Sequence, residues 1–329
     1  MAFYIGNVKI EGQVVLAPMA GVTNLAYRKI CKQYQASLVY SEMISDKGLY
    51  YHDKKTLALT KIDKQEHPIA IQIFGGDLET LLYAAKFVDQ NTDADIIDIN
   101  MGCSVPKILK SHAGSAYLLD PQRIYDTVKT IVENVKKPVT VKIRIGWDHQ
   151  HINALEVATK IKEAGASALA IHGRTKSDLY QGTVNYSIIK EIKEQLKDFP
   201  IIVNGDITTP QKAKEVLELT KCEAVMIGRA SYGNPYIFQQ IQQYLKTGKL
   251  LPPLTLQTKI QILKSYALDL IELKGENVAI RELRQHAGWF LKDFKQSAQI
   301  RKKVSLITSF AELLKILQDI EQENITKNE

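Results

Sequence analysis

Cys103 is the residue whose type and position most directly suggest chemistry. It closes residues 98–103 (DINMGC), directly behind the apolar run Ile96–Ile99. A short apolar run bounded by Asn, Gly and Ser predicts a buried strand that ends in a turn. Because rigid scaffolds hold their reactive groups in loops at strand ends, we expect the thiol to face a ligand rather than the core.

Polar or small residues follow the other apolar runs of the first 230 residues in the same way. Buried polar groups are costly unless they are paired, so this many polar strand ends predicts a ligand in their midst. The residues concerned are Pro18, Met19, Ala20, Glu42, Gln72, Asn100, Lys142, Arg144, His172, Arg174, Asn204, Gly205, Asp206, Gly228 and Arg229.

The last two of these strand ends suggest a phosphate site. Residues 204–206 (NGD) follow the seventh run, and Gly228–Arg229 follow the eighth. Small residues, backbone N–H groups and an always-charged guanidinium are thereby placed where barrels commonly bind phosphate. The pair of sites at neighbouring strands is stronger evidence than one glycine turn.

Lys142 is predicted to point inward. Alternation within residues 139–144 (VTVKIR) places Thr140, Lys142 and Arg144 on one face of a strand. An ammonium there would stabilise the anionic ring of a reduced flavin held by its phosphate. The alternative is that Lys142 forms an ion pair with Glu42 or Asp98.

Eight apolar runs, each followed by a segment of helical periodicity, must position these groups. Strands that alternate with helices pair in parallel, and eight units in about 230 residues match a closed (β/α)8 TIM barrel. An open doubly wound sheet is the competing fold, but no Gly-x-Gly-x-x-Gly turn follows Leu16. The runs are Val14–Ala17, Leu38–Tyr40, Ile69–Phe74, Ile96–Ile99, Val139–Ile143, Ala168–Ile171, Ile201–Val203 and Ala224–Ile227.

Composition predicts a water-soluble globular protein. The chain has 329 residues, 45% of them hydrophobic, with no apolar run as long as the roughly 18 residues of a membrane span. The amino terminus lacks the pattern of a signal peptide, so we expect a cytoplasmic protein. The lack of a membrane span predicts no membrane association. Cys31, Cys103 and Cys222 have neither metal-ligand nor disulfide spacing, which predicts free thiols and no metal site. No feature requires a protein partner.

A second, helical domain is predicted after the punctuated linker 246–253. Apolar residues there recur at intervals of three and four, within 256–271, 280–294 and 310–320, which is typical of a helical bundle. We therefore expect a barrel domain at 1–245, a helical domain at 254–320 and a frayed tail at 321–329.

The positive charge of the chain is concentrated in the helical region. Residues 241–310 hold twelve Lys or Arg and five Asp or Glu, a net of +7 that equals the excess of the whole chain. Arg281, Arg284 and Lys292 fall on one stripe, which would ordinarily be a solvated face. The cations at 301–303, placed before a helix expected to start at Val304, would oppose its dipole unless a polyanion bound them. The pattern favours RNA phosphates as the partner.

The chain resembles the tRNA-dihydrouridine synthases, most of all their bacterial B-type subgroup. The resemblance covers about the first 240 residues, and its motifs recur in the order of the family. It rests on residues 17–23 (APMAGVT), Gln72, residues 100–103 (NMGC), 142–144 (KIR), 172–175 (HGRT), 204–206 (NGD) and 228–229 (GR).

The resemblance implies an FMN enzyme that takes hydride from NADPH and delivers it to a uridine of tRNA. Asn100 and Arg144 would contact the substrate base, while Arg281, Arg284 and Lys292 would bind tRNA. The residues that would hold FMN, along its ring, ribityl chain and phosphate, are Pro18, Met19, Ala20, Gln72, Lys142, His172, Arg174, Asn204, Gly205, Asp206, Gly228 and Arg229.

Cys103 would then be the general acid. Hydride addition at C6 of uracil builds negative charge over C5 and O4, so a proton must reach C5. A thiol near its ordinary pKa of ~8.5 is mostly protonated at neutral pH and needs no activating base. The family motif usually has proline after this cysteine, whereas Ser104 stands here and Pro106 follows two residues later. The stiffness of this loop is thereby in question.

Two other functions remain compatible with the residues. An FMN barrel acting on a free pyrimidine or a dihydroorotate-like metabolite would share the barrel and the cysteine, but would leave the basic helical region unexplained. A noncatalytic RNA-binding protein would leave the acid and the cofactor residues unexplained. The sequence does not distinguish NADPH from NADH, and it specifies neither the uridine that is reduced nor the oligomeric state.

Overall fold

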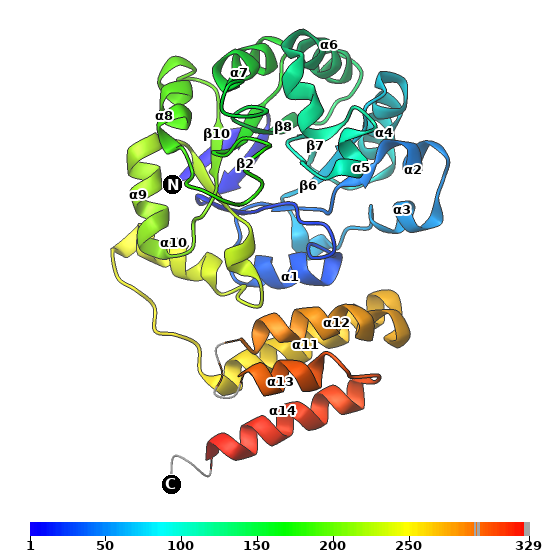
Figure 1. Cartoon of the computed structure of the whole chain (residues 1–329), viewed down its shortest axis with the longest axis vertical. Helices are drawn as coiled ribbons and strands as arrows, with labels where there is room; N and C mark the ends of the chain where they lie inside the picture. The colour runs from blue at the N-terminus through cyan, green and yellow to red at the C-terminus, as the bar shows by residue number, and fades with distance from the viewer. Residues whose placement is uncertain (293, 295–296, 326–329) are drawn as a thin grey trace.

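The computed structural model describes residues 1–292, 294 and 297–325, and within 1–245 it forms a parallel barrel surrounded by helices (Figure 1). Neighbouring strands follow the order β3-β11-β10-β9-β8-β7-β6-β4. A parallel bridge between Val15 and Leu38 joins the first and last strands of this order. The strands are β3 (Val14–Leu16), β4 (Val39–Tyr40), β6 (Ile69–Phe74), β7 (Ile96–Met101), β8 (Val139–Arg144), β9 (Ala168–His172), β10 (Ile201–Asn204) and β11 (Ala224–Ile227).

All eight predicted runs are barrel strands, and the TIM barrel is confirmed. The register places Asn100 beside Lys142, and Arg144 beside His172, on neighbouring strands. The polar ends of the strands therefore meet at one end of the barrel, as expected for parallel strands.

Three short strands were not expected from the sequence. The strands β1 (Ala2–Ile5) and β2 (Val8–Glu11) form an antiparallel hairpin, and β5 (Ile44–Ser45) pairs with the end of β6. Ile5 and Ile10 of the hairpin are buried against residues near the starts of the barrel strands, such as Ile96 and Ala168. The hairpin therefore covers the end of the barrel opposite the polar strand ends.

Helices cover the outside of the strands, and their starts carry the expected capping residues. Side chains of Asn24, Asp77 and Asp120 accept hydrogen bonds from backbone N–H groups in the first turns of α1, α4 and α6. The helices are α1 (Leu25–Gln33), α2 (Asp46–Tyr50), α3 (Lys54–Ala58), α4 (Leu78–Asn91), α5 (Pro106–Leu109), α6 (Pro121–Val132), α7 (Ala154–Glu163), α8 (Tyr186–Gln195), α9 (Pro210–Thr220) and α10 (Ile237–Thr247), with 3-10 turns η1 (Lys64–Glu66), η2 (Gly114–Leu119) and η3 (Arg229–Ser231).

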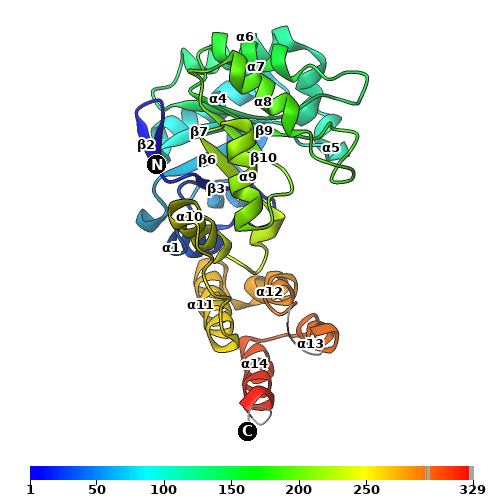
Figure 2. The same ribbon diagram turned by 90° about the vertical axis from the view of Figure 1, so that its left-hand side faces the viewer.

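Four further helices form a layer beside the barrel, next to α1 and α10 (Figures 1 and 2). They are α11 (Leu256–Lys274), α12 (Glu276–Phe290), α13 (Ser297–Val304) and α14 (Phe310–Ile325). Helix α14 runs through 321–325, where a frayed tail was expected, and Lys264 of α11 pairs with Glu321 there. The rest of that expected tail, 326–329, lies outside the described residues. None of the helices in the described ranges is long and apolar enough to cross a bilayer.

Candidate active site

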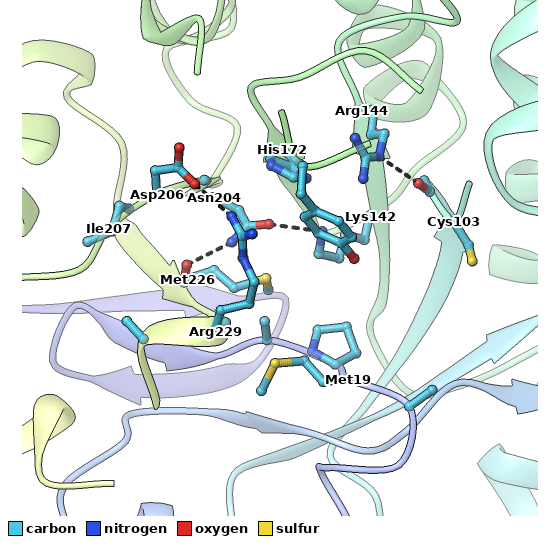
Figure 3. A pocket seen from close by; sticks show the side chains of 18 of the residues that line it. Met19, Cys103, Lys142, Arg144, His172, Asn204, Asp206, Ile207, Met226 and Arg229 are labelled. Carbon is cyan, nitrogen blue, oxygen red and sulfur yellow. Dashed lines mark hydrogen bonds and ion pairs between the residues drawn. The ribbon is translucent and has the colours of Figure 1, made fainter. Parts of the chain in front are cut away.

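A cavity of about 750 Å³ lies at the polar ends of the barrel strands (Figure 3). This volume is within the usual range for ligand sites, about 300–1,000 Å³. Every residue predicted for the site lines it except Glu42, Arg174, Arg281 and Arg284. The cavity lining therefore contains predicted residues from strands around the whole barrel, and Lys292 from the helical region.

A chain of buried hydrogen bonds connects the barrel interior to Cys103. Gln72 donates through Nε2 to the carboxylate of Asp98, at 2.6 Å, and accepts through Oε1 from Asn100 Nδ2, at 2.8 Å. The Oδ1 of Asn100 accepts from the backbone N–H of Cys103, at 2.9 Å. Burial raises the pKa of Asp98 to about 6, opposed by hydrogen bonds from Thr140 and Gln72. Asn100 therefore shapes the turn that carries the thiol.

Lys142 points into the cavity, as strand alternation predicted. Its Nζ donates to Oδ1 of Asn204, at 3.2 Å, and Asn204 in turn donates to the carbonyl of Met226. Burial, and secondarily the charge of Arg144, lower the pKa of Lys142 to about 8. The Lys142 ammonium is thus available to a ligand at neutral pH, while Glu42 instead accepts a hydrogen bond from the backbone N–H of Gly21.

Cys103 is half-buried at the cavity wall, whereas Cys31 and Cys222 are buried; all three are free thiols, as expected. Burial raises the pKa of the Cys103 thiol, more than the nearby Arg144 and Lys142 charges lower it. The thiol is therefore protonated at neutral pH and suited to donate a proton.

The loop after Cys103 is restrained without the usual proline. The backbone N–H of Ser115 donates to the Cys103 carbonyl, at 2.9 Å. Pro106 occupies the first turn of α5, where its fixed φ suits a helix start. Arg123 of α6 donates to the carbonyls of Gly76 and His112, at 2.6 and 3.0 Å, which ties the far side of this loop to the barrel.

Arg144 occupies the cavity wall and is buried among backbone carbonyls. Its Nε donates to Gly102, at 3.1 Å, and its Nη1 donates to Thr175 and Leu179, both at 2.8 Å. Its guanidinium also lies 5.6 Å from the centre of the Tyr180 ring. Arg144 therefore holds two mouth loops in place, the one that carries Cys103 and the one after β9, besides the contact with substrate predicted for it.

His172 is neutral. Burial, followed by the charges of Lys142 and the nearby arginines, lowers its pKa to about 2. A neutral imidazole offers a ligand one donor and one acceptor.

Arg174 lies behind the cavity wall rather than on it. It is 2% exposed, forms an ion pair with Asp206, and donates to the carbonyls of Gln181 and Gly182, at 2.8 and 2.7 Å. The Arg174 guanidinium holds the pKa of Asp206 below its ordinary value. Arg229 donates to the same carboxylate, at 2.9 Å, and lines the cavity. Of the two arginines, Arg229 therefore faces the cavity and Arg174 does not.

The three helical-region cations occupy different environments. Arg281 is exposed, Arg284 donates through Nε to the carbonyl of Ile307, at 2.9 Å, and Lys292 is exposed at the cavity rim. The dipole argument for residues 301–303 was wrong. These cations occupy the last turn of α13, where they stabilise the helix dipole without any polyanion. Residues 297–304 are mostly polar, so their sequence pattern did not predict this helix.

Several cavity residues were not predicted from the sequence. Met43, Tyr180, Tyr232 and Asn234 line it. Tyr180 and Tyr232 follow strand-end motifs, but a loop aromatic more often covers the edge of a core, so sequence alone carried no clear signal.

The comparison with protein families decides the classification. Residues 15–328 match the model described as "Dihydrouridine synthase (Dus)". The chain belongs to the dihydrouridine synthase family. It is thereby a flavin-dependent oxidoreductase, in agreement with the expected flavin site.

Two relatives show how far the similarity extends. The tRNA-dihydrouridine synthase B of Shewanella oneidensis is 38% identical over 315 residues, covering 95% of this chain and 97% of that protein. The protein of the same name from Pseudomonas syringae pv. tomato is 41% identical over 301 residues, covering 91% of this chain and 88% of that protein. The similarity therefore extends beyond the barrel into the helical region.

A solved structure shows the fold independently. Histamine dehydrogenase from Rhizobium sp. 4-9 superposes with a TM-score of 0.58 at 12% identity. The match covers 75% of this chain and 47% of that longer chain. At this identity the likeness supports the barrel fold alone.

Proposed function

We propose that this enzyme reduces uridine in tRNA to 5,6-dihydrouridine, with FMN as its bound flavin and NADPH as the reductant. The observation that carries the proposal is the placement of a protonated, half-buried Cys103 thiol and an ammonium, Lys142, in one cavity. The family, and the activity named for its relatives from Shewanella oneidensis and Pseudomonas syringae, supply the reaction class.

The cavity lining suits FMN. Pro18, Met19 and Ala20 offer a flat, largely apolar wall for the ring, and Gln72 and Lys142 offer polar groups to its edge. Arg229 and the turns at 204–206 and 228–229 offer a guanidinium and backbone N–H groups for the phosphate. Gly205 has a φ of +129°, which favours glycine at this turn. When bound, FMN would supply the hydride for C6 of uracil.

Cys103 supplies the proton. Its S–H transfers a proton to C5 of the base as negative charge builds over C5 and O4, and solvent then restores the thiol. Arg144 and Lys142 stabilise the thiolate left behind, while Asn100 holds the Cys103 backbone in position. Neutral His172 can hydrogen-bond the flavin or the base without adding charge.

We further propose that the helical region and the cavity rim bind tRNA through its backbone. Exposed Arg281 and Lys292 are the cations best placed for phosphates, whereas Arg284 also maintains the fold. The target base must leave its stack to reach the cavity floor, as in other enzymes that act on bases. Lys292 at the rim would stand near the entering nucleotide.

The test is dihydrouridine formation in unmodified tRNA with purified protein, FMN and NADPH, comparing wild type with Cys103→Ala. Cys31→Ala is a matched control, because that thiol is buried away from the cavity. We expect Cys103→Ala to lower product formation about 10²–10⁴-fold, the usual contribution of a general acid, without slowing flavin reduction. Undiminished product would remove Cys103 from its role. Turnover of free uracil or dihydroorotate without RNA would favour the small-molecule alternative, and a protein without flavin would favour the noncatalytic one.

A further inference from the structure

Helix α12 reaches the loop that begins the cavity wall through His286. The imidazole is buried, and its Nε2 lies 2.9 Å from the carbonyl oxygen of Gly21. A carbonyl oxygen can only accept, so Nε2 carries the proton and Nδ1 accepts from the hydroxyl of Tyr266. The Tyr266 oxygen accepts in turn from Nδ2 of Asn24, at 3.2 Å. Both ends of segment 21–24 are therefore hydrogen-bonded to α11 and α12.

Gly21 is held from two sides. Its N–H donates to the carboxylate of Glu42 on the barrel, and its carbonyl accepts from His286. Its φ is +71°, a backbone conformation that residues other than glycine rarely adopt. The residues just before it are Pro18, Met19 and Ala20, which line the cavity. His286 therefore fixes the end of the very segment on which the flavin ring would lie.

A column of stacked rings joins the same helix to the other side of the cavity. Trp289 stacks on His286, with ring centres 4.7 Å apart, and on Tyr232, with ring centres 4.3 Å apart. Tyr232 lines the cavity just after Gly228 and Arg229. At Gly233 an added Cβ would lie 2.3 Å from the carbonyl carbon of Trp289, so this loop and α12 meet backbone to backbone.

The loop at 228–234 is also joined to α1, the helix that directly follows the loop at 17–24. The hydroxyl of Tyr27, on α1, donates to the carbonyl of Ser231. The Tyr27 ring packs edge-on against Tyr266, with ring centres 5.8 Å apart. One connected network thus links the loop at 17–24, the loop at 228–234 and two helices of the basic region.

We infer that α12 is a structural part of the flavin site, with His286 and Trp289 as positioning residues that hold the 17–24 and 228–234 loops ready for the cofactor. This inference rests on the proposed FMN site. Loops ordered before binding cost less entropy when the ligand arrives, so the helical region raises cofactor affinity as well as carrying cations for RNA. Removing the hydrogen bond from His286 to Gly21 should raise the Kd for FMN, although His286 does not line the cavity.

The experiment is a titration of apo-protein with FMN, without RNA or NADPH, following flavin fluorescence and the visible circular dichroism of the bound flavin. His286→Phe keeps an aromatic ring in the stack and removes the bond to Gly21. We expect the Kd for FMN to rise about 10-fold, with an altered dichroism band. His286→Gln retains a donor for the Gly21 carbonyl and should recover most of the affinity. Gln285→Ala, an exposed neighbour on the same helix, is the matched control and should leave the Kd unchanged.

A folded His286→Phe protein with the wild-type Kd and dichroism would overturn the inference and leave the proposed function standing. Wild-type protein that does not bind FMN would overturn the proposed cofactor and this inference together. If His286→Phe does not fold, Tyr266→Phe provides the same test, because it removes only the hydroxyl that orients the imidazole. A 2- to 5-fold rise in the FMN Kd of that variant would support the inference, and an unchanged Kd would overturn it.

Discussion

Replacing Glu66 by Ala should destabilise the protein more than replacing both Glu66 and its partner. Glu66 and Arg28 form an ion pair whose side chains are 0% and 3% exposed, with 2.6 Å between Oε1 and Nε. Arg28 also donates to the carbonyls of Thr23 and Lys61, both at 2.9 Å. The pair therefore supports the end of the loop that begins the cavity wall.

The magnitude follows from the burial of the pair. Removing Glu66 alone leaves the guanidinium buried and unpaired, which costs about 3–5 kcal/mol in the free energy of unfolding. The double replacement Arg28→Met with Glu66→Met removes both charges and fills their volume. Its remaining cost is the hydrogen bonds lost by the carbonyls of Thr23 and Lys61 and by the Asp63 N–H, about 3 kcal/mol in all.

Urea-induced unfolding, followed by far-ultraviolet circular dichroism, measures both variants. The double variant should have the higher urea midpoint, by the equivalent of about 1 kcal/mol. A double variant that is less stable than Glu66→Ala would refute the reasoning, because the uncompensated charge would then not dominate. Lys9→Met is a control, since its ion pair with Glu11 is exposed and should contribute little.

Three other predictions concern function. Burial lowers the pKa of Lys142 to about 8, so the side chain is charged below that pH and neutral above it. The rate of flavin reduction by NADPH should therefore fall as the pH rises through 8. The variant Lys142→Arg, which stays charged, should remove this dependence. Arg281→Ala should weaken tRNA binding and lower its salt slope by about 1, as measured by filter binding at several ionic strengths; an unchanged slope would contradict a phosphate contact. Arg174→Lys should speed tryptic cleavage after Lys176, because one ammonium cannot hold both Asp206 and the 181–182 carbonyls; unchanged proteolysis would show that the loop is held otherwise.

The barrel was predictable because its strands are buried on both faces. Such strands are continuous apolar runs, and Ile69–Phe74 and Ala224–Ile227 have the bounds that the sequence predicted. The hairpin β1–β2 was missed because each strand has only four residues and β1 (AFYI) does not alternate, although β2 (VKIE) does; β5 is two residues long. Helix α13 was missed because few apolar residues mark its face. Residues 301–303 were therefore expected before the start of a helix, whereas they lie in the last turn of α13.

The candidate site was predictable to the extent that strand ends converge. Lys142 lies within an apolar run, and His172 and Asn204 directly follow theirs, so the barrel itself brings the three together. The contact of His286 with Gly21 spans 265 residues and depends on how the helical layer packs on α1. No local pattern encodes such a contact, and the sequence therefore did not single out His286.

The position of Arg144 limits which changes the mouth of the cavity can accept. One guanidinium bonds the carbonyls of Gly102, Thr175 and Leu179, so the thiol loop and the loop after β9 share a single anchor. An insertion or deletion between 175 and 179 would move one carbonyl away from that anchor and disturb the backbone beside Cys103. Variation in this loop should therefore accumulate as side-chain substitutions at constant length, while length changes are accommodated in loops that do not bond Arg144.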